Sequence, residues 1–150
     1  MVVVTAASGD ECSGCLVGFH GQSSIDPMRY CVWISKANHT YSVIVRATHF
    51  AVHFLTDHDH DLADLFGGTT GDNIDKFAQV DTKLGAGDTP TIDRCPNRIV
   101  ARRVVLMDNG GDHVCIVGEP VDTSYAPFVP LRMSGVADVS PGHAADDLPA

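Results

Sequence analysis

Two segments rich in small and hydroxyl-bearing residues follow apolar runs near the beginning of the chain. The first contains Gln22, Ser23 and Ser24, and the second runs from Ser35 to Thr40. Turns of this composition leave backbone N–H groups free to face an anion. The second turn also precedes a helical pattern, and a helix N-terminus favours a phosphate. Two such turns in one small domain suggest a phosphorylated cofactor.

Lys36 is the candidate counter-ion for that phosphate. Lysine occurs only at positions 36, 76 and 83 of a chain that carries a formal net charge of −9. A plainer interpretation exists for each turn. The first can be an ordinary turn before Asp26–Pro27, and the second can be a helix start capped by its own Asn38 or Thr40. For the second turn, capping and anion binding are compatible.

Other chemistry-bearing residues favour structural roles. Cys12 and Cys15 have the spacing of a redox or zinc pair, but no second pair accompanies them and they enter a strand. His58 and His60 point to different sides of a predicted helix, so we predict no metal site. The chain contains no nucleophile elbow, P-loop or zinc-protease motif. That pattern is consistent with chemistry supplied by a cofactor.

Size and composition limit the possible partners and location. A chain of 150 residues can fold around one core. It has no basic stripe, so nucleic acid is not expected as a partner. No apolar run approaches the roughly 20 residues that span a bilayer. The run Val2–Thr5 resembles a strand and not a signal peptide, and with five cysteines expected to be reduced we predict a cytoplasmic protein.

The order of predicted elements favours a mainly β fold. We expect strands over 2–6, 12–20, 30–34, 49–55, 98–107 and 112–119. We expect two helices, one capped by Thr40 and one by Thr56 or Asp57, as well as a further turn within 72–78 and a loop over 84–90. The aromatic residues expected in the core are Trp33, Phe50, Phe54 and Phe66. Asn109–Gly110 is a strong hairpin signal between the last two strands. Such a non-alternating order predicts a closed antiparallel barrel with a few short helices. We divide the chain into a domain over 1–123 and an extended tail over 124–150, which packs on a partner subunit and ends in disorder.

Several ordered segments carry a family resemblance over residues 2–121. They are the stretch from Gly14 to Pro27, Ser35–Thr40, Phe50–Leu55, Asp75–Phe77 and Gly111–His113. Taken together, these segments resemble the flavin reductase-like, FMN-binding split-barrel family. The resemblance implies a homodimeric split β-barrel that binds FMN near the subunit interface. It also implies hydride transfer from NADH or NADPH to the flavin, which then supplies a partner monooxygenase.

The resemblance also implies roles for individual residues. Along the flavin ring it places Leu16, Val17 and Gly18, and at the ring edge and ribityl chain it places Gln22, Ser23 and Ser24. The phosphate would be bound by Ser35, Lys36, Asn38 and Thr40. Two further residues are implied to lie near the pocket, Lys76 and Phe77. His113 matches a position near the nicotinamide, where it is the candidate catalytic residue.

Three departures from the family pattern leave alternatives open. Leu16 and Gly18 stand where the family often has Thr and Asn, Met28 replaces a second proline, and the helix that usually precedes the first strand is missing. FAD or a deazaflavin therefore remains an alternative to FMN. The same departures favour, as a second hypothesis, a flavin carrier without reductase turnover, and a structural partner with an empty groove is a third.

Overall fold

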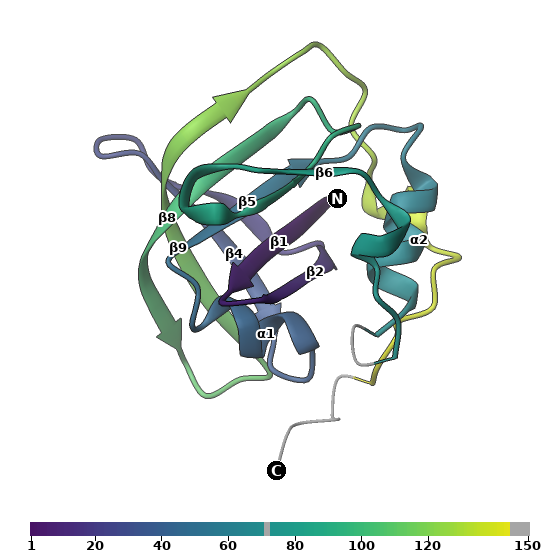
Figure 1. Ribbon diagram of the computed structural model, residues 1–150, viewed down its shortest axis with the longest axis horizontal. Helices are drawn as coiled ribbons and strands as arrows, with labels where there is room; N and C mark the ends of the chain where they lie inside the picture. Colours follow the sequence, from purple (N-terminus) through teal and green to yellow (C-terminus); the bar gives the residue numbers. More distant parts are fainter. Residues whose placement is uncertain (71–72, 145–150) are drawn as a thin grey trace.

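A seven-stranded antiparallel sheet forms the body of the molecule (Figure 1). The computed structural model describes residues 1–70 and 73–144. The strands follow the spatial order β2-β1-β5-β8-β9-β4-β3, and their bounds are β1 Val2–Ser8, β2 Glu11–Val17, β3 His20–Ser24, β4 Arg29–Ser35, β5 His49–Phe54, β8 Arg98–Asp108 and β9 His113–Ser124. A separate hairpin pairs β6 (Thr82–Leu84) with β7 (Pro90–Ile92), and the helices are α1 (His39–Ile44) and α2 (His60–Gly68). The mainly β, split-barrel fold predicted from the sequence is confirmed.

The apolar run in β1 is explained by burial on both faces of the strand. Val2 and Val4 belong to the barrel core, which α1 closes at one end (Figure 1). Val3 belongs instead to a second core between the sheet and α2. Successive side chains of a strand point to opposite faces, so three consecutive valines serve two cores.

The strands β4, β9 and β8 alternate between an inner and an outer row. Val32, Ile116 and Leu106 are register partners on the barrel side. Trp33, Cys115 and Met107 form the neighbouring row, which faces outward. Trp33 is 37% exposed and Met107 is 51% exposed. The expectation that Trp33 is a core residue was wrong, because its position in β4 turns it away from the barrel interior.

Two predicted boundaries in the N-terminal half differ from the structure. The strand expected over 12–20 ends at Val17, and a new strand, β3, begins at His20. Gln22–Ser24 belongs to β3, which pairs with β4, so the chain reverses over residues 25–28 and not at the predicted polar turn. An edge strand needs only backbone pairing along one side, so a polar sequence can form one.

Of the two caps predicted for the first helix, Asn38 is the one that forms, and the second helix begins later than predicted. Asn38 caps α1 by accepting a hydrogen bond from the Thr40 N–H at 3.1 Å, whereas Thr40 is fully buried inside the first turn. Helix α2 begins at His60, after Asp59. Asp59 accepts hydrogen bonds from the N–H and hydroxyl of Thr56.

The remaining connections contain more structure than the sequence predicts. The loop expected over 84–90 includes the end of β6, a 3₁₀ turn over Ala86–Asp88 and the start of β7. Part of the turn expected over 72–78 lies outside the described residues, and the 3₁₀ turn that follows spans Phe77–Gln79.

The segment after β9 packs against its own chain. Leu131 and Val136 are buried in the second core with α2, and η3 (Met133–Val136) lies beside that helix (Figure 1). Packing of this segment on a partner subunit, and its separation as a unit at residue 123, stay predictions; residues 145–150 lie outside the described part of the chain.

Two features of the described residues concern membrane spanning and metal binding. None of the helices in 1–70 and 73–144 has the length and apolar character needed to cross a bilayer. Within the same two ranges, no group of three His, Cys, Asp or Glu side chains could hold a metal ion. His60 contacts Asp138 at 3.0 Å, and Cys12 and Cys15 are free thiols.

Candidate functional site

A groove lies where the end of β2 meets β4, the end of α2 and the segment after β9. Its volume is ≈ 300 Å³, at the lower limit of small-molecule sites. The residues that line it are Met1, Cys15–Phe19, Trp33–Ser35, Asn38, Phe66, Gly67, Thr69, Thr70, His113, Met133, Val136, Val139 and Pro141–His143. None of these described lining residues is Asp, Glu, Lys or Arg, so the groove suits an uncharged and largely apolar body.

Close packing of α2 on β2 forms one side of the groove. A Cβ on Gly67 would lie 2.8 Å from a methyl group of Leu16, so glycine permits this approach. The Lys76 ammonium fastens the same junction by donating hydrogen bonds to the carbonyls of Phe66 at 3.1 Å and Gly14 at 3.3 Å. Lys76 is buried, and burial lowers the pKa of its ammonium group. Its position explains how the helix end is held beside the strand.

The polar end of the groove lies at the start of α1. The Ser35 hydroxyl accepts a hydrogen bond from the Ala37 N–H at 3.3 Å, and the Asn38 side chain caps the helix. Both side chains line the groove. Thr69 and Thr70 at the end of α2 also line the groove, and the Thr69 hydroxyl donates a hydrogen bond to the Leu65 carbonyl at 2.7 Å. Hydroxyl and amide groups of this kind can bind the polar part of a ligand whose ring lies against the apolar side.

His113 stands at the rim, at the first position of β9. It is the register partner of Ser35, and its Nδ1 lies 2.9 Å from an Asp112 carboxylate oxygen. Its ring packs edge-on against Phe19, with centroids 5.5 Å apart. This arrangement orients the imidazole toward the groove without burying it.

The groove brings together six of the thirteen site residues predicted from the sequence. Those that line it are Leu16, Val17, Gly18, Ser35, Asn38 and His113. They come from β2, β4, the α1 cap and β9, so segments far apart in the sequence converge as the resemblance implies. Their roles toward a cofactor stay predictions.

The other predicted residues do not line this groove. Gln22, Ser23 and Ser24 lie along β3, where the Ser23 hydroxyl accepts a hydrogen bond from the Cys31 thiol at 3.0 Å. Thr40 is buried with its hydroxyl 3.0 Å from that of Ser13.

Lys36, Lys76 and Phe77 also have other partners. The Lys36 ammonium contacts Asp108 at 2.9 Å. Phe77 packs edge-on against Phe66, beside Lys76. A phosphate contact for Lys36 therefore requires exchange of its carboxylate partner.

Sequence reasoning missed several lining residues. Trp33 was assigned to the core, although its separation of two residues from Cys31 places both on the outer face of β4. Phe19 directly follows Gly18 and could have been predicted together with it. Met133 and Val136 carried no signal, because only the folded chain brings them beside β2.

A family model described as a flavin reductase-like domain matches residues 1–130, which include every strand and all but the last wall of the groove. The chain belongs to the flavin reductase-like domain family. The reductase component of the flavin-dependent trigonelline monooxygenase of Acinetobacter baylyi is 26% identical over 152 residues, covering 99% of this chain and 47% of that protein. An NADH-dependent FMN reductase of Agrobacterium fabrum is 28% identical over 137 residues, covering 91% and 76%. The chain thus spans less than half the length of the first relative.

A solved structure supports the fold of this flavin reductase-like domain. The NADH:FAD oxidoreductase of Streptomyces globisporus superposes with a TM-score of 0.76 at 22% identity, covering 86% of this chain and 77% of that one. At this level of identity the similarity establishes the split-barrel architecture alone.

Proposed function

We propose that this domain binds a flavin in the groove and transfers hydride to it from NADH or NADPH. The observation that carries the proposal is a groove with an apolar, aromatic side and a hydroxyl- and amide-bearing end, in a chain of the flavin reductase-like family. When bound, a flavin supplies the hydride-accepting ring, so the protein needs only to align two planar rings and exclude competing reactions.

The lining residues fit the parts of a flavin. Leu16, Val17 and Gly18 offer an apolar edge and backbone groups to the ring. We assign Ser35 and Asn38 to the ribityl or phosphate group, because both line the polar end of the groove. His113, at the rim, is positioned to donate a hydrogen bond to a nicotinamide or phosphate group and is our candidate for contact with the second substrate.

FMN is the flavin we propose, with FAD and a deazaflavin as alternatives. The Agrobacterium fabrum relative is named for FMN, and the Streptomyces globisporus structure for FAD. The absorption spectrum of the purified protein, followed by mass analysis of released cofactor, distinguishes the three.

The test of the activity is NADH and NADPH oxidation by the purified protein with each flavin added in turn. We expect oxidation that depends on flavin and saturates with it. Absence of oxidation with every flavin would refute the reductase proposal. Tight flavin retention without oxidation would instead favour a carrier, a possibility that the apolar residues at Leu16 and Gly18 motivate.

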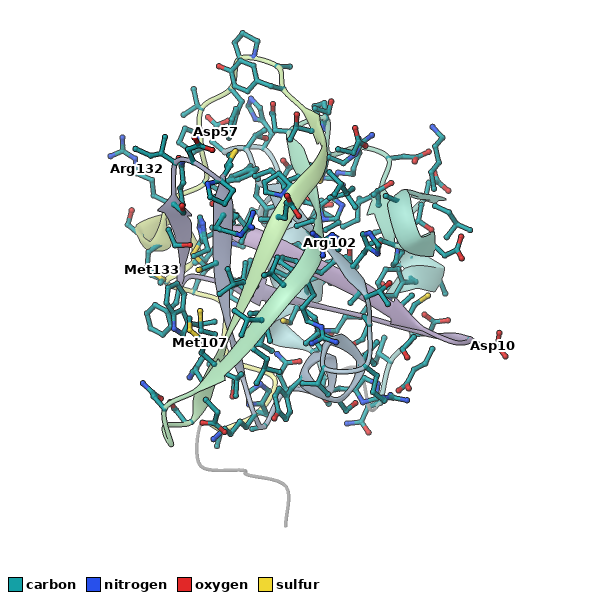
Figure 2. The ribbon with its side chains drawn as sticks, turned by 90° about the vertical axis from the view of Figure 1, so that its left-hand side faces the viewer. Asp10, Asp57, Arg102, Met107, Arg132 and Met133 are labelled. Carbon is teal, nitrogen blue, oxygen red and sulfur yellow. The ribbon has the colours of Figure 1, made fainter. Side chains whose placement is uncertain are left out.

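We also propose that the outer face of β4, β9 and β8 is a homodimer contact. Two neighbouring rows expose Trp33, Val105 and Met107, and Met107 is labelled in Figure 2. Exposed apolar patches mark association sites. Light scattering should find a dimer that Val105→Glu converts to a monomer, and a wild-type monomer would remove the proposal.

Delivery of reduced flavin to a partner monooxygenase is the role we infer in the cell. The Acinetobacter baylyi relative is a monooxygenase reductase component. Its match suggests the same kind of partner here. The five free cysteines support a reducing compartment such as the cytoplasm.

A further inference from the structure

The last wall of the groove comes from residues after the family domain. The family model ends at residue 130, whereas the groove is also lined by residues between 133 and 143. This segment is anchored at both ends. The Leu131 N–H donates to the Leu55 carbonyl at 2.9 Å, and the Gly142 N–H donates to the Gly67 carbonyl at 3.1 Å.

Buried side chains strengthen these anchors. Leu131 and Val136 are 5% and 7% exposed and pack in the second core. Because the core holds the segment between its two hydrogen-bonded ends, the groove has a fixed wall here.

Met133 is the residue of this wall that reaches across to β2. A Cβ on Gly18 would lie 2.6 Å from the Met133 terminal methyl group, so a side chain at position 18 would have to displace the tip of this methionine. Met133 is nevertheless 58% exposed, and it lies at the edge of the molecule in Figure 2. Much of its thioether therefore remains available to a ligand.

We infer that Met133 is a binding residue of the groove wall that contacts the flavin ring; this inference rests on the proposed function. Gly18 and Met133 present no charge and no hydroxyl group, so the ligand part that suits them is uncharged and apolar. A methionine thioether packs favourably against aromatic rings and adapts to their edges. Since the contact involves the ring, it should act equally on flavins with and without a phosphate.

The experiment compares Met133→Ala with Met28→Ala as a matched control. Met28 is also a partly exposed methionine, at 42%, but it lies in the turn before β4 and does not line the groove. Dissociation constants for FMN and for riboflavin are measured by fluorescence titration of the apoprotein, together with its melting temperature. Met133→Leu, which conserves volume, is the second variant.

We expect Met133→Ala to raise both dissociation constants about fivefold, through the loss of one partial side-chain contact. Met28→Ala should leave them unchanged, and Met133→Leu should stay within about twofold of wild type. Equal affinities for wild type and Met133→Ala would overturn the inference, as would a loss confined to FMN. Wild-type protein that binds neither flavin would overturn the proposed function itself, which is a separate result.

Discussion

His53 provides a sharp test of how the barrel is held together. Its side chain is fully buried in β5. Its Nε2 accepts a hydrogen bond from the Ile92 N–H at 3.0 Å, so the proton resides on Nδ1, which donates to the Val3 carbonyl at 3.1 Å. One neutral imidazole therefore links β1, β5 and β7, and a second proton would face the Ile92 N–H.

The magnitude follows from the pKa of this histidine. Burial lowers the pKa of His53 from 6.5 to about 4, although the hydrogen bond to the Val3 carbonyl acts in the opposite direction. The folded pKa lies below the unfolded one, so the unfolded chain binds more protons between these values. The stabilisation is present above about pH 6.5 and is lost as the pH falls through the folded pKa. The pKa difference corresponds to about 3 kcal/mol in the free energy of unfolding, of which about 2 kcal/mol is lost between pH 7 and pH 5.

Urea unfolding of wild type and His53→Gln at pH 7 and pH 5 measures this effect. Glutamine cannot be protonated, and it replaces the imidazole imperfectly, so we expect the variant to be less stable at pH 7 by about 1–3 kcal/mol. This difference in the free energy of unfolding should be about 2 kcal/mol smaller at pH 5, because only wild type has a histidine that is neutral when folded and protonated when unfolded at that pH. His58→Gln is the control, since the His58 side chain is 90% exposed. A gap between wild type and His53→Gln that is the same at both pH values would refute the reasoning.

Three further variants test the site and its support. Thr40→Val should lower the free energy of unfolding, measured with urea, by about 1–2 kcal/mol, because it leaves the buried Ser13 hydroxyl without its partner. Flavin affinity should stay unchanged, and a large loss of affinity would contradict the placement of Thr40 away from the groove. Asn38→Ala should lower the free energy of unfolding by about 1 kcal/mol in the same assay, because the α1 cap is lost. Unchanged stability would show that the cap is dispensable. Lys36→Ala should change stability by less than about 1 kcal/mol, because its ion pair with Asp108 is partly exposed. The resemblance implies that Lys36 contacts the FMN phosphate, which requires it to exchange its Asp108 partner; on that basis Lys36→Ala should raise the FMN dissociation constant about tenfold in titrations and leave riboflavin binding unchanged. An unchanged FMN dissociation constant would show that Lys36 does not contact the phosphate.

Local sequence patterns were sufficient where an element depends on its own residues. The hairpin of β8 and β9 was predicted because Asn109–Gly110 has the chemistry of a tight turn and the flanking runs favour strands. Strand β5 was predicted from the alternation of Phe50, Val52 and Phe54. By contrast, Gln22–Ser24 forms an edge strand through backbone pairing with β4, and such pairing leaves no apolar alternation in the sequence.

Side-chain direction was the main obstacle to predicting the site. The family resemblance marked Lys76 and Thr40 as polar residues near a cofactor. Tertiary packing turned the Lys76 ammonium to the carbonyls at the α2–β2 junction and the Thr40 hydroxyl to Ser13. For His113 and Asn38 the implied positions do line the groove, because strand register and a helix cap fix their direction.

The groove is built at the seam between the two cores, and this determines which residues can tune it. The barrel core fixes β2 and β4, which form one side. The other side depends on the second core, through Phe66 in α2 and Val136 in η3, and both residues line the groove while packing in that core. A volume change in the second core should therefore move this wall, and a change in the barrel core should move the opposite side through Val17 and Ile34, which pack in that core and line the groove. The segment of the second core after residue 130 lies outside the family match, so the family model does not fix this wall of the groove.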